Sequence, residues 1–122
     1  MQAKPKIKPV EWISSSLKYL KSMPEDVQDV FGKALFIAQL GSKDDAAKPL
    51  KGFTGAGVLE VVEDHDGDTY RAVYTVRFAD VVYVLHVFQK KSKRGIVTPK
   101  EEIATIKSRL AIAEELHRSK GR

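Results

Sequence analysis

The chemistry that this sequence could perform is indicated first by a run of basic side chains. The segment 89–100 carries five basic residues and no acidic one, and four of the five are Lys90, Lys91, Lys93 and Arg94. Clustered ammonium and guanidinium groups bind phosphate oxygens through charge-assisted hydrogen bonds. The segment therefore indicates a site for a phosphate-bearing ligand.

A further cation stands in an apolar context. Arg71 lies in YRAVYT (70–75), a stretch otherwise typical of a buried strand. A buried guanidinium costs free energy unless an acid neutralises it or a ligand uses it. Glu60, on the neighbouring predicted strand, is the candidate acid. The residues alone leave two interpretations open, a structural ion pair and an arginine that binds phosphate.

Motifs for metals and nucleotides are not found. The histidines fall on three different predicted elements, without the spacing of a zinc site. Three alternating aspartates resemble the start of a calcium loop but lack its later glutamate, so a solvated turn explains them better: Asp64, Asp66 and Asp68. The glycines of 51–57 do not match a phosphate-binding loop. There is no cysteine, which excludes disulfides and cysteine nucleophiles. No metal or other cofactor is expected.

Length and charge limit the class of protein. The 122 residues have room for one domain, and we expect 1–122 to form it. Lys and Arg outnumber Asp and Glu by 21 to 16. Six of these cations lie in the ends, 1–8 and 117–122, which we expect to be flexible. The body is then nearly balanced in charge, so the basic segment is a local patch. Without a signal peptide or a membrane-spanning run, a soluble cytoplasmic protein with no membrane partner is expected.

Three helices are predicted to support these residues. Serines at 14–16 can cap a short helix that ends near Lys21. Pro24 suits the first position of a second helix, whose apolar residues recur at helical spacing until Gly41. The short connection predicts an antiparallel helical hairpin. A last helix is predicted from Thr98 as N-cap, with Pro99 in the first position and Glu101 reaching back.

Strands are predicted between the helical segments. Residues 57–63 and 69–77 read as a hairpin around Asp66–Gly67, and 81–88 is apolar on both faces, which is typical of a central strand. A short edge strand is possible within 7–12. The expected fold is α+β, with an antiparallel three- to four-stranded sheet, the helical hairpin and the C-terminal helix.

The register of the last two strands decides which lysine shares a face with Arg71. With a three-residue loop at 78–80, Arg71 opposes Val87, and Lys91 lies on its face. With a two-residue loop, Lys90 takes that place. In either case one of the two lysines converges with Arg71.

These residues also carry a resemblance to a known family. KPLKGF (48–53), the strand with Glu60, YRAVYT (70–75), YVLHVFQKKSKRG (83–95) and TPKEEI (98–103) resemble, in this order, the HigB-like, phage-derived toxin branch of the RelE/ParE superfamily. The resemblance runs from about residue 10 to residue 116. It implies the RelE-like fold and the toxin of a type II toxin–antitoxin pair.

The resemblance implies a reaction and partners as well. RelE-like members cut messenger RNA on the ribosome without a metal: the ribose 2′-hydroxyl attacks the adjacent phosphorus and displaces the 5′-oxygen. The partners implied are a cognate helix-turn-helix antitoxin and mRNA on the ribosome. Arg71 resembles the phosphate-binding arginine of the superfamily. Lys91 stands where the family has a basic residue that stabilises or protonates the leaving group.

The other roles follow less directly. Lys90, Lys93 and Arg94 would bind the flanking RNA backbone. RelE has two lysines in the first strand of this meander, and the nearest positions here are Glu60 and Val62. Glu60 is then either the general base or only the partner of Arg71. RelE also has a C-terminal tyrosine that stacks on a base, and the candidates for this role here are Phe88 or His86. His86 lies on a mostly apolar face, so a packed core histidine is the other interpretation.

Two other functions remain open at this point. A ParE-like toxin would inhibit gyrase and cut no RNA, on the same scaffold. A non-toxic nucleic-acid-binding domain would bind RNA mainly through its charges. The basic segment favours the ribonuclease over the ParE-like toxin, and the nucleic-acid-binding domain stays open.

Overall fold

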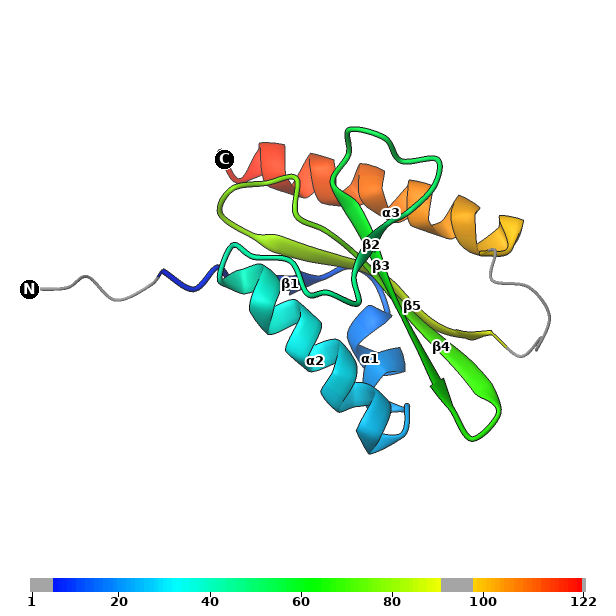
Figure 1. The fold of residues 1–122 in the computed structure, drawn as a ribbon. Helices are drawn as coiled ribbons and strands as arrows, with labels where there is room; N and C mark the ends of the chain where they lie inside the picture. The colour runs from blue at the N-terminus through cyan, green and yellow to red at the C-terminus, as the bar shows by residue number, and fades with distance from the viewer. Residues whose placement is uncertain (1–5, 91–97, 122) are drawn as a thin grey trace, which may run out of the picture.

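The computed structural model describes residues 6–90 and 98–121. The chain forms, in order, β1 (Val10–Trp12), α1 (Ser16–Lys21), α2 (Glu25–Gln39), β2 (Lys48–Pro49), β3 (Val58–His65), β4 (Asp68–Thr75), β5 (Val82–Lys90) and α3 (Lys100–Ser119) (Figure 1). The predicted α+β class is confirmed, because the strands form one sheet and the helices pack on it.

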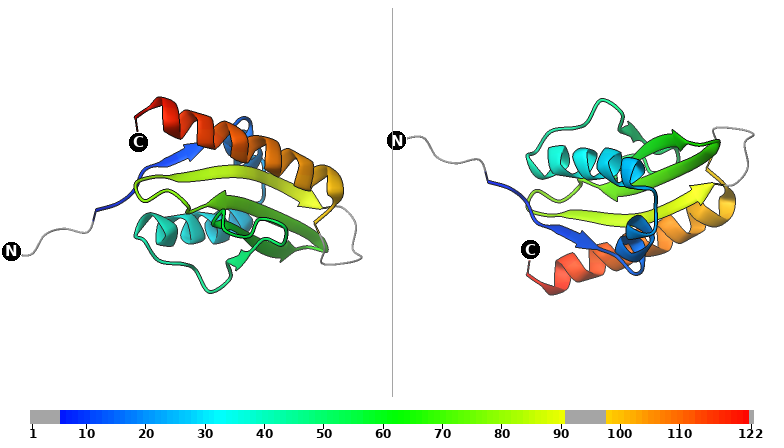
Figure 2. Two further views of the ribbon diagram at one scale, coloured as in Figure 1. Left: turned by 90° about the horizontal axis from the view of Figure 1, so that it is seen from above. Right: turned by 90° about the horizontal axis from the view of Figure 1, so that it is seen from below.

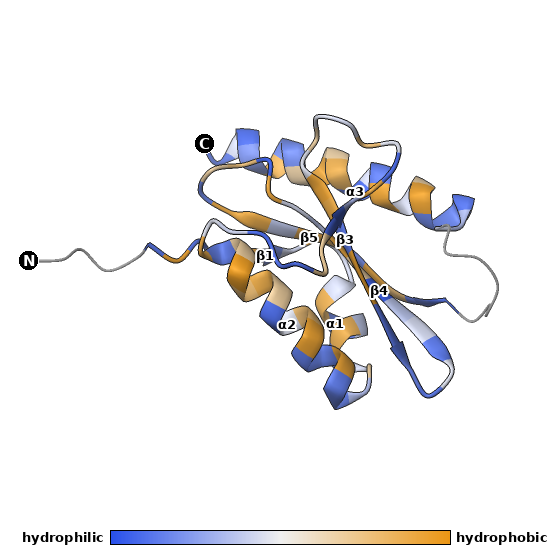
Figure 3. Ribbon diagram, viewed as in Figure 1, coloured by the Kyte–Doolittle hydropathy of each residue, from blue (hydrophilic) through white to orange (hydrophobic). Residues whose placement is uncertain are grey.

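The sheet lies between two helices, with α3 on one face and α2 on the other, and α1 lies beside β5 at the edge of the sheet (Figure 2). Its strand order is β1-β5-β4-β3-β2. Apolar side chains of α2 pack on one face of the sheet, and Ile106 and Ala113 of α3 pack on the other. In Figure 3 much of β5 and α2 is orange, whereas the turn between β3 and β4 is blue. β4 and β5 are buried on both faces, as expected of central strands.

The sheet differs from the expected one in two respects. It has five strands in place of three or four, because Lys48–Pro49 pairs with β3 as a two-residue edge strand. It is mixed, because β1 runs parallel to β5 while the other pairs are antiparallel. The edge position predicted for the 7–12 strand is confirmed. β1 and β2 are only three and two residues long, which is too short to show the alternation of a strand. The sequence therefore predicts neither the fifth strand nor the parallel pairing of β1.

The hairpin between β3 and β4 turns as its sequence predicts. Asp66 and Gly67 both have positive φ, 50° and 83°. This is the combination required by a tight turn between twisted antiparallel strands. The oxygen Oδ1 of Asp64 accepts a hydrogen bond from the Thr69 hydroxyl at 2.9 Å. The alternating aspartates thus belong to a solvated hairpin turn.

A β-bulge in β5 changes the predicted register. Thr75 opposes Tyr83 and Tyr74 opposes Val84, as a three-residue loop predicts. Val73 then opposes His86, so the chain carries one additional residue at Leu85. From this point Arg71 opposes Phe88 rather than Val87, and the expected alternation of faces is reversed.

The bulge decides which side chains share a face. Val82, Val84 and Val87 belong to the core under α2, whereas Tyr83, Leu85 and Phe88 belong to the core under α3. Strict alternation along 81–88 would place Val87 with Tyr83 and Leu85, and Phe88 with Val82 and Val84. Because Lys90 follows Phe88 by two residues, it is the lysine on the Arg71 side of the sheet.

The start of α3 differs from the predicted one. α3 begins at Lys100 with Pro99 as N-cap and no side-chain capping bond, so Thr98 is not its cap. The flexibility of 1–8 and 117–122 stays a prediction, and three described residues of these ends make contacts with the rest of the chain. Lys8 and Gln39 exchange two hydrogen bonds, His117 contacts Tyr83, and Lys120 forms an ion pair with Glu11.

Candidate functional site

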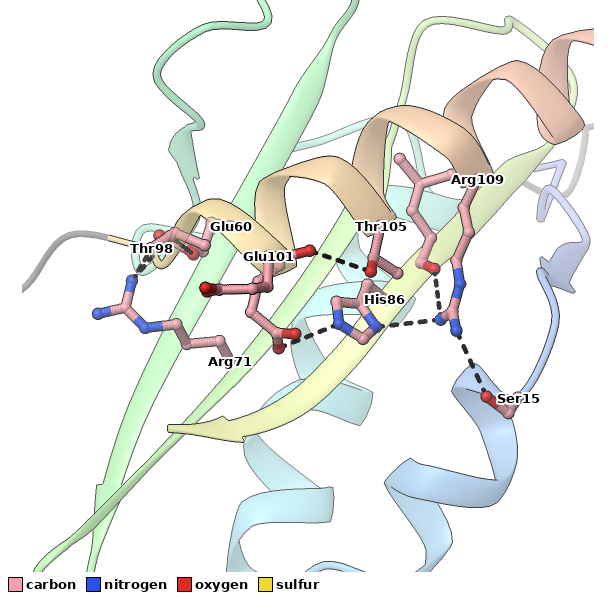
Figure 4. Close-up of polar contacts among 10 residues, drawn as sticks. Ser15, Glu60, Arg71, His86, Thr98, Glu101, Thr105 and Arg109 are labelled. Carbon is pink, nitrogen blue, oxygen red and sulfur yellow. Dashed lines mark hydrogen bonds and ion pairs between the residues drawn. The ribbon is translucent and has the colours of Figure 1, made fainter. Parts of the chain in front are cut away.

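Arg71 and Glu60 form a buried ion pair on the α3 face of the sheet (Figure 4). Arg71 Nη1 donates to Glu60 Oε1 at 3.1 Å, and the two side chains are only 3% and 13% exposed. The pair joins neighbouring strands, since Arg71 opposes Val62 and Glu60 opposes Val73. The structure therefore brings together the two residues that the sequence proposed as partners.

Thr98 completes this cluster. Its hydroxyl donates to Glu60 Oε2 at 2.8 Å and accepts from Arg71 Nη1 at 3.2 Å. Sequence reasoning gave Thr98 the role of a helix cap, but its hydroxyl bridges a carboxylate and a guanidinium instead. Both oxygens of Glu60 thus accept a hydrogen bond, and a carboxylate has lone pairs for further donors. The cluster fixes the position of Glu60 on a rigid sheet.

A cavity of about 400 Å³ opens beside Glu60 and Thr98. Its other walls come from the β2 segment and the first turn of α3: Lys48, Pro49, Leu50, Lys51 and Ile103. Glu60 and Thr98 therefore reach solvent through this cavity, while Arg71 lies behind them at 2% exposure. A ligand in this cavity would meet the carboxylate and the hydroxyl before the guanidinium.

His86 is held in a second polar cluster on the same face (Figure 4). Its Nε2 lies 3.1 Å from Glu102 Oε2, and its Nδ1 lies 3.0 Å from Arg109 Nη1. A guanidinium can only donate, so Nδ1 accepts from Arg109 and Nε2–H donates to Glu102. Arg109 also donates to the Leu85 carbonyl at 3.1 Å. The contacts fix one neutral tautomer of the imidazole.

Burial lowers the pKa of the His86 imidazole below its ordinary value of 6.5. Arg109 acts in the same direction, whereas the charge and hydrogen bond of Glu102 raise the pKa. The net lowering agrees with the geometry, because a proton on Nδ1 would face the guanidinium of Arg109. His86 is therefore neutral at pH 7 and is held by two residues of α3.

The second cavity, of about 510 Å³, lies between α1 and α3 at the β5 edge. β1 pairs with β5 only at Val82–Val84, which leaves the following half of β5 beside this cavity. His86 and Phe88 both line it, and their rings stack with centroids 4.7 Å apart. Half-exposed Tyr19 of α1 stands across from them. The cavity thus offers aromatic surface beside the hydrogen-bonding groups of Glu102 and Arg109.

The basic segment is placed only in part. Lys90 ends β5 opposite Thr69 and is half-buried. Lys91, Lys93 and Arg94 lie outside the described residues. Of the predicted site residues, Arg71, Glu60, His86, Phe88 and Lys90 thus share the α3 side of the sheet.

Three residues of the site were missed by sequence reasoning: Thr98, Glu102 and Arg109. Glu102 and Arg109 belong to α3, and Thr98 lies two residues before it. Their partners in β3 and β5 are 16 to 38 residues away in the sequence. Glu102 and Arg109 are seven residues apart, which is two helical turns and hence one face of α3. Two charged residues on one face of an amphipathic helix were the sequence signal that could have indicated this part of the site.

Within residues 6–90 and 98–121, no three His, Asp or Glu side chains are grouped so as to hold a metal ion. No helix in this described part is long and apolar enough to cross a membrane.

The sequence and the fold were compared with known proteins. The comparison with curated proteins returned no match. Among solved structures, the fold is similar to a doubly substituted mutant of the E. coli toxin RelE in the free state. The TM-score is 0.54 and the identity 19%, and the match covers 88% of this chain and 97% of that one. Residues 18–111 match the model described as "Phage derived protein Gp49-like (DUF891)". The chain has a RelE-like fold and belongs to the phage-derived Gp49-like family.

Proposed function

We propose that the chain is the toxin of a type II toxin–antitoxin pair, and that it acts as a metal-independent endoribonuclease on translated mRNA. The observation that carries the proposal is the buried Glu60–Arg71–Thr98 cluster beside an open cavity. It supplies a carboxylate and a guanidinium at fixed positions on a sheet. The Gp49-like family and the likeness to the toxin RelE support the same function.

In the proposed reaction Glu60 is the general base. Its carboxylate takes the proton of a ribose 2′-hydroxyl, and the 2′-oxygen forms a bond to the adjacent phosphorus. The bond from phosphorus to the 5′-oxygen breaks, which leaves a 2′,3′-cyclic phosphate and a 5′-hydroxyl end. Arg71 stabilises the charge on the pentavalent phosphorane. Lys91, which lies outside the described residues, is proposed to give a proton to the leaving 5′-oxygen.

Arg71 has to exchange contacts for this role. Its guanidinium is covered by Glu60 and Thr98 in this structure. We propose that a substrate phosphate replaces the neutral Thr98 hydroxyl, because a charge-assisted bond from an arginine to phosphate is the stronger of the two. The ion pair with Glu60 can persist, so the base stays oriented while the phosphate binds.

The remaining residues are proposed to bind RNA. Lys90, Lys93 and Arg94 bind backbone phosphates near the strand end. His86 and Phe88 offer their rings to a base in the cavity between α1 and α3. Stacking on aromatic side chains is the usual way in which proteins hold single-stranded bases. The proposed partners are a helix-turn-helix antitoxin and the ribosome with its mRNA, in the cytoplasm.

The experiment is induced expression of the chain and of three variants in a host without the antitoxin. Growth is followed, and transcripts are mapped by primer extension. Arg71→Lys and Lys91→Ala should relieve the arrest and abolish new 5′ ends, while the proteins stay folded by circular dichroism. Arg77→Ala is the control, because Arg77 also forms an ion pair but is 47% exposed at the end of the hairpin.

The outcomes separate the alternatives. If Arg71→Lys and Lys91→Ala both remain fully toxic, the assignment of the site is wrong. Arrested replication with intact transcripts would contradict the nuclease and support a ParE-like gyrase inhibitor. Unaffected growth with intact RNA at high expression would contradict the toxin and leave a nucleic-acid-binding domain.

A further inference from the structure

Two exposed lysines stand at the mouth of the cavity beside Glu60. Lys48 and Lys51 both line it, and both are exposed to solvent. Among the described residues neither takes part in an ion pair. Exposed lysines are common on proteins, but these two border a cavity that Glu60 and Thr98 also line.

Lys48 lies beside Glu60 in the sheet, but no described ion pair joins the two side chains. Lys48 is the direct cross-strand partner of Glu60, a position in which a lysine and a glutamate normally attract each other. The two carboxylate oxygens of Glu60 accept hydrogen bonds from Arg71 and Thr98 instead. The ammonium group of Lys48 is thus left beside the cavity with its hydrogen-bonding capacity available to a ligand.

The backbone that carries the lysines is fixed by its neighbours. Leu50 and Phe53 are buried in the core under α3, at 8% and 6% exposure. The Leu50 N–H donates to the Val58 carbonyl at 3.0 Å, and Gly52 makes the turn with a φ of 93°. The backbone that carries Lys48 and Lys51 is therefore held in place, so little backbone entropy is lost when they bind a ligand.

The charges around the cavity favour an anion. Lys48, Lys51 and the guanidinium behind Glu60 contribute three positive charges, against one negative charge on Glu60 itself. Pro49, Leu50 and Ile103 give the same cavity an apolar surface. A ligand with anionic groups at the rim and less polar parts inside is the chemical match. A single-stranded RNA, with its phosphates and its ribose and base, has this character.

We infer that Lys48 and Lys51 bind two backbone phosphates of the RNA next to the scissile one, so that the strand crosses the β2 edge of the sheet. This inference rests on the proposed function and deepens it, because it assigns the path of the substrate. Lys48 and Lys51 position the ribose at Glu60 and are not part of the bond-making groups.

The test measures RNA binding at a series of salt concentrations. The probe is a ten-nucleotide, fluorescein-labelled RNA with 2′-O-methyl riboses, which cannot be cleaved by 2′-oxygen attack. The full chain is compared with Lys48→Ala/Lys51→Ala and with Lys33→Ala/Lys43→Ala. The control pair removes the same charge from two exposed residues that do not line the cavity, one on α2 and one in the connection that follows it.

A single strand contributes about 0.7 to the slope of log K against log salt for each phosphate neutralised. Loss of two contacts should make the slope shallower by about 1.4, and weaken binding at 0.1 M salt by about 25-fold. The control pair should leave the slope unchanged. Equal slopes for the two double variants, or no RNA binding by the unaltered chain, would overturn the inference.

The binding test is independent of cleavage. If Arg71→Lys abolishes toxicity but Lys48→Ala/Lys51→Ala binds the probe with an unchanged slope, the substrate path is wrong and the proposed function stands. If the chain is not toxic and cuts no RNA, the proposed function fails, whatever the slopes are.

Discussion

Replacing one partner of the Arg71–Glu60 pair should destabilise the fold far more than replacing both. In Glu60→Leu, a guanidinium that is 3% exposed loses its carboxylate, and in Arg71→Met the carboxylate loses its cation. Breaking a buried pair in this way costs about 3–5 kcal/mol in the free energy of unfolding. For a domain near 100 residues, 1 kcal/mol corresponds to roughly 4 °C in Tm. Each single variant should therefore melt about 12–20 °C lower.

The double variant Glu60→Leu/Arg71→Met should lose less than either single one, because it leaves no buried charge uncompensated. Urea unfolding followed by circular dichroism gives the four free energies of the cycle. The control cycle is the pair of Arg77 and Glu114, whose side chains are 47% and 37% exposed. An exposed pair of this kind contributes about 0–1 kcal/mol.

Single variants that lose no more than the control pair would refute the reasoning, since the charges would then be solvated rather than buried. The double variant also separates structure from function. If it folds stably and is no longer toxic, the two residues act on the substrate. If it folds stably and is fully toxic, the pair is structural only, and the proposed base and phosphate ligand are wrong.

Three further predictions concern other parts of the fold. The pKa of His86 is lowered in the folded state, so the unfolded chain binds a proton at a higher pH than the folded one. The free energy of unfolding should therefore fall as the pH drops below about 6.5. In urea unfolding from pH 5 to 8, His86→Gln should remove this dependence of the midpoint on pH. Gly57→Ala should cost more than about 1 kcal/mol, because φ is 61° and the new Cβ would lie 2.9 Å from the Arg77 nitrogen. Gly55→Ala, with φ of 81° and open space, is its control, and equal losses in thermal unfolding would contradict the contact argument. Burial raises the pKa of Tyr74 to about 12, with Asp44 adding to the shift. In an ultraviolet titration, Tyr74→Phe should therefore lack the phenol that ionises last. The same titration curve for the variant and the unaltered chain would contradict this assignment.

Local sequence signals were sufficient where a few adjacent residues determine the conformation. The Asp66–Gly67 turn and the end of α2 near Gly41 follow from residues that adopt positive φ. The partnership of Arg71 and Glu60 was predictable because a buried cation needs an acid and the hairpin brings β3 beside β4. These inferences need only local conformation and strand pairing.

The bulge at Leu85 could not be predicted in this way. All residues from Val82 to Val87 except His86 are apolar, so a strand shifted by one residue still buries apolar side chains on both faces. Binary patterning fixes the register only where one face is polar. In β5 the choice depends on packing against α3 and on the contacts of His86 with Glu102 and Arg109. These contacts are long-range and leave no pattern in β5 itself.

The start of α3 links its capping to the candidate site. With Pro99 as N-cap, the helix begins without a side-chain cap, so the Thr98 hydroxyl is not used by a helical N–H. That hydroxyl is instead 2.8 Å from Glu60 and 3.2 Å from Arg71. A Thr98→Val variant would keep the shape and remove the bridge, while a Thr98→Ser variant would keep it. If Thr98 is what a phosphate displaces from Arg71, Thr98→Val should bind the uncleavable RNA at least as tightly as the unaltered chain. A weaker complex in Thr98→Val, rescued in Thr98→Ser, would instead place the hydroxyl among the groups that hold the substrate.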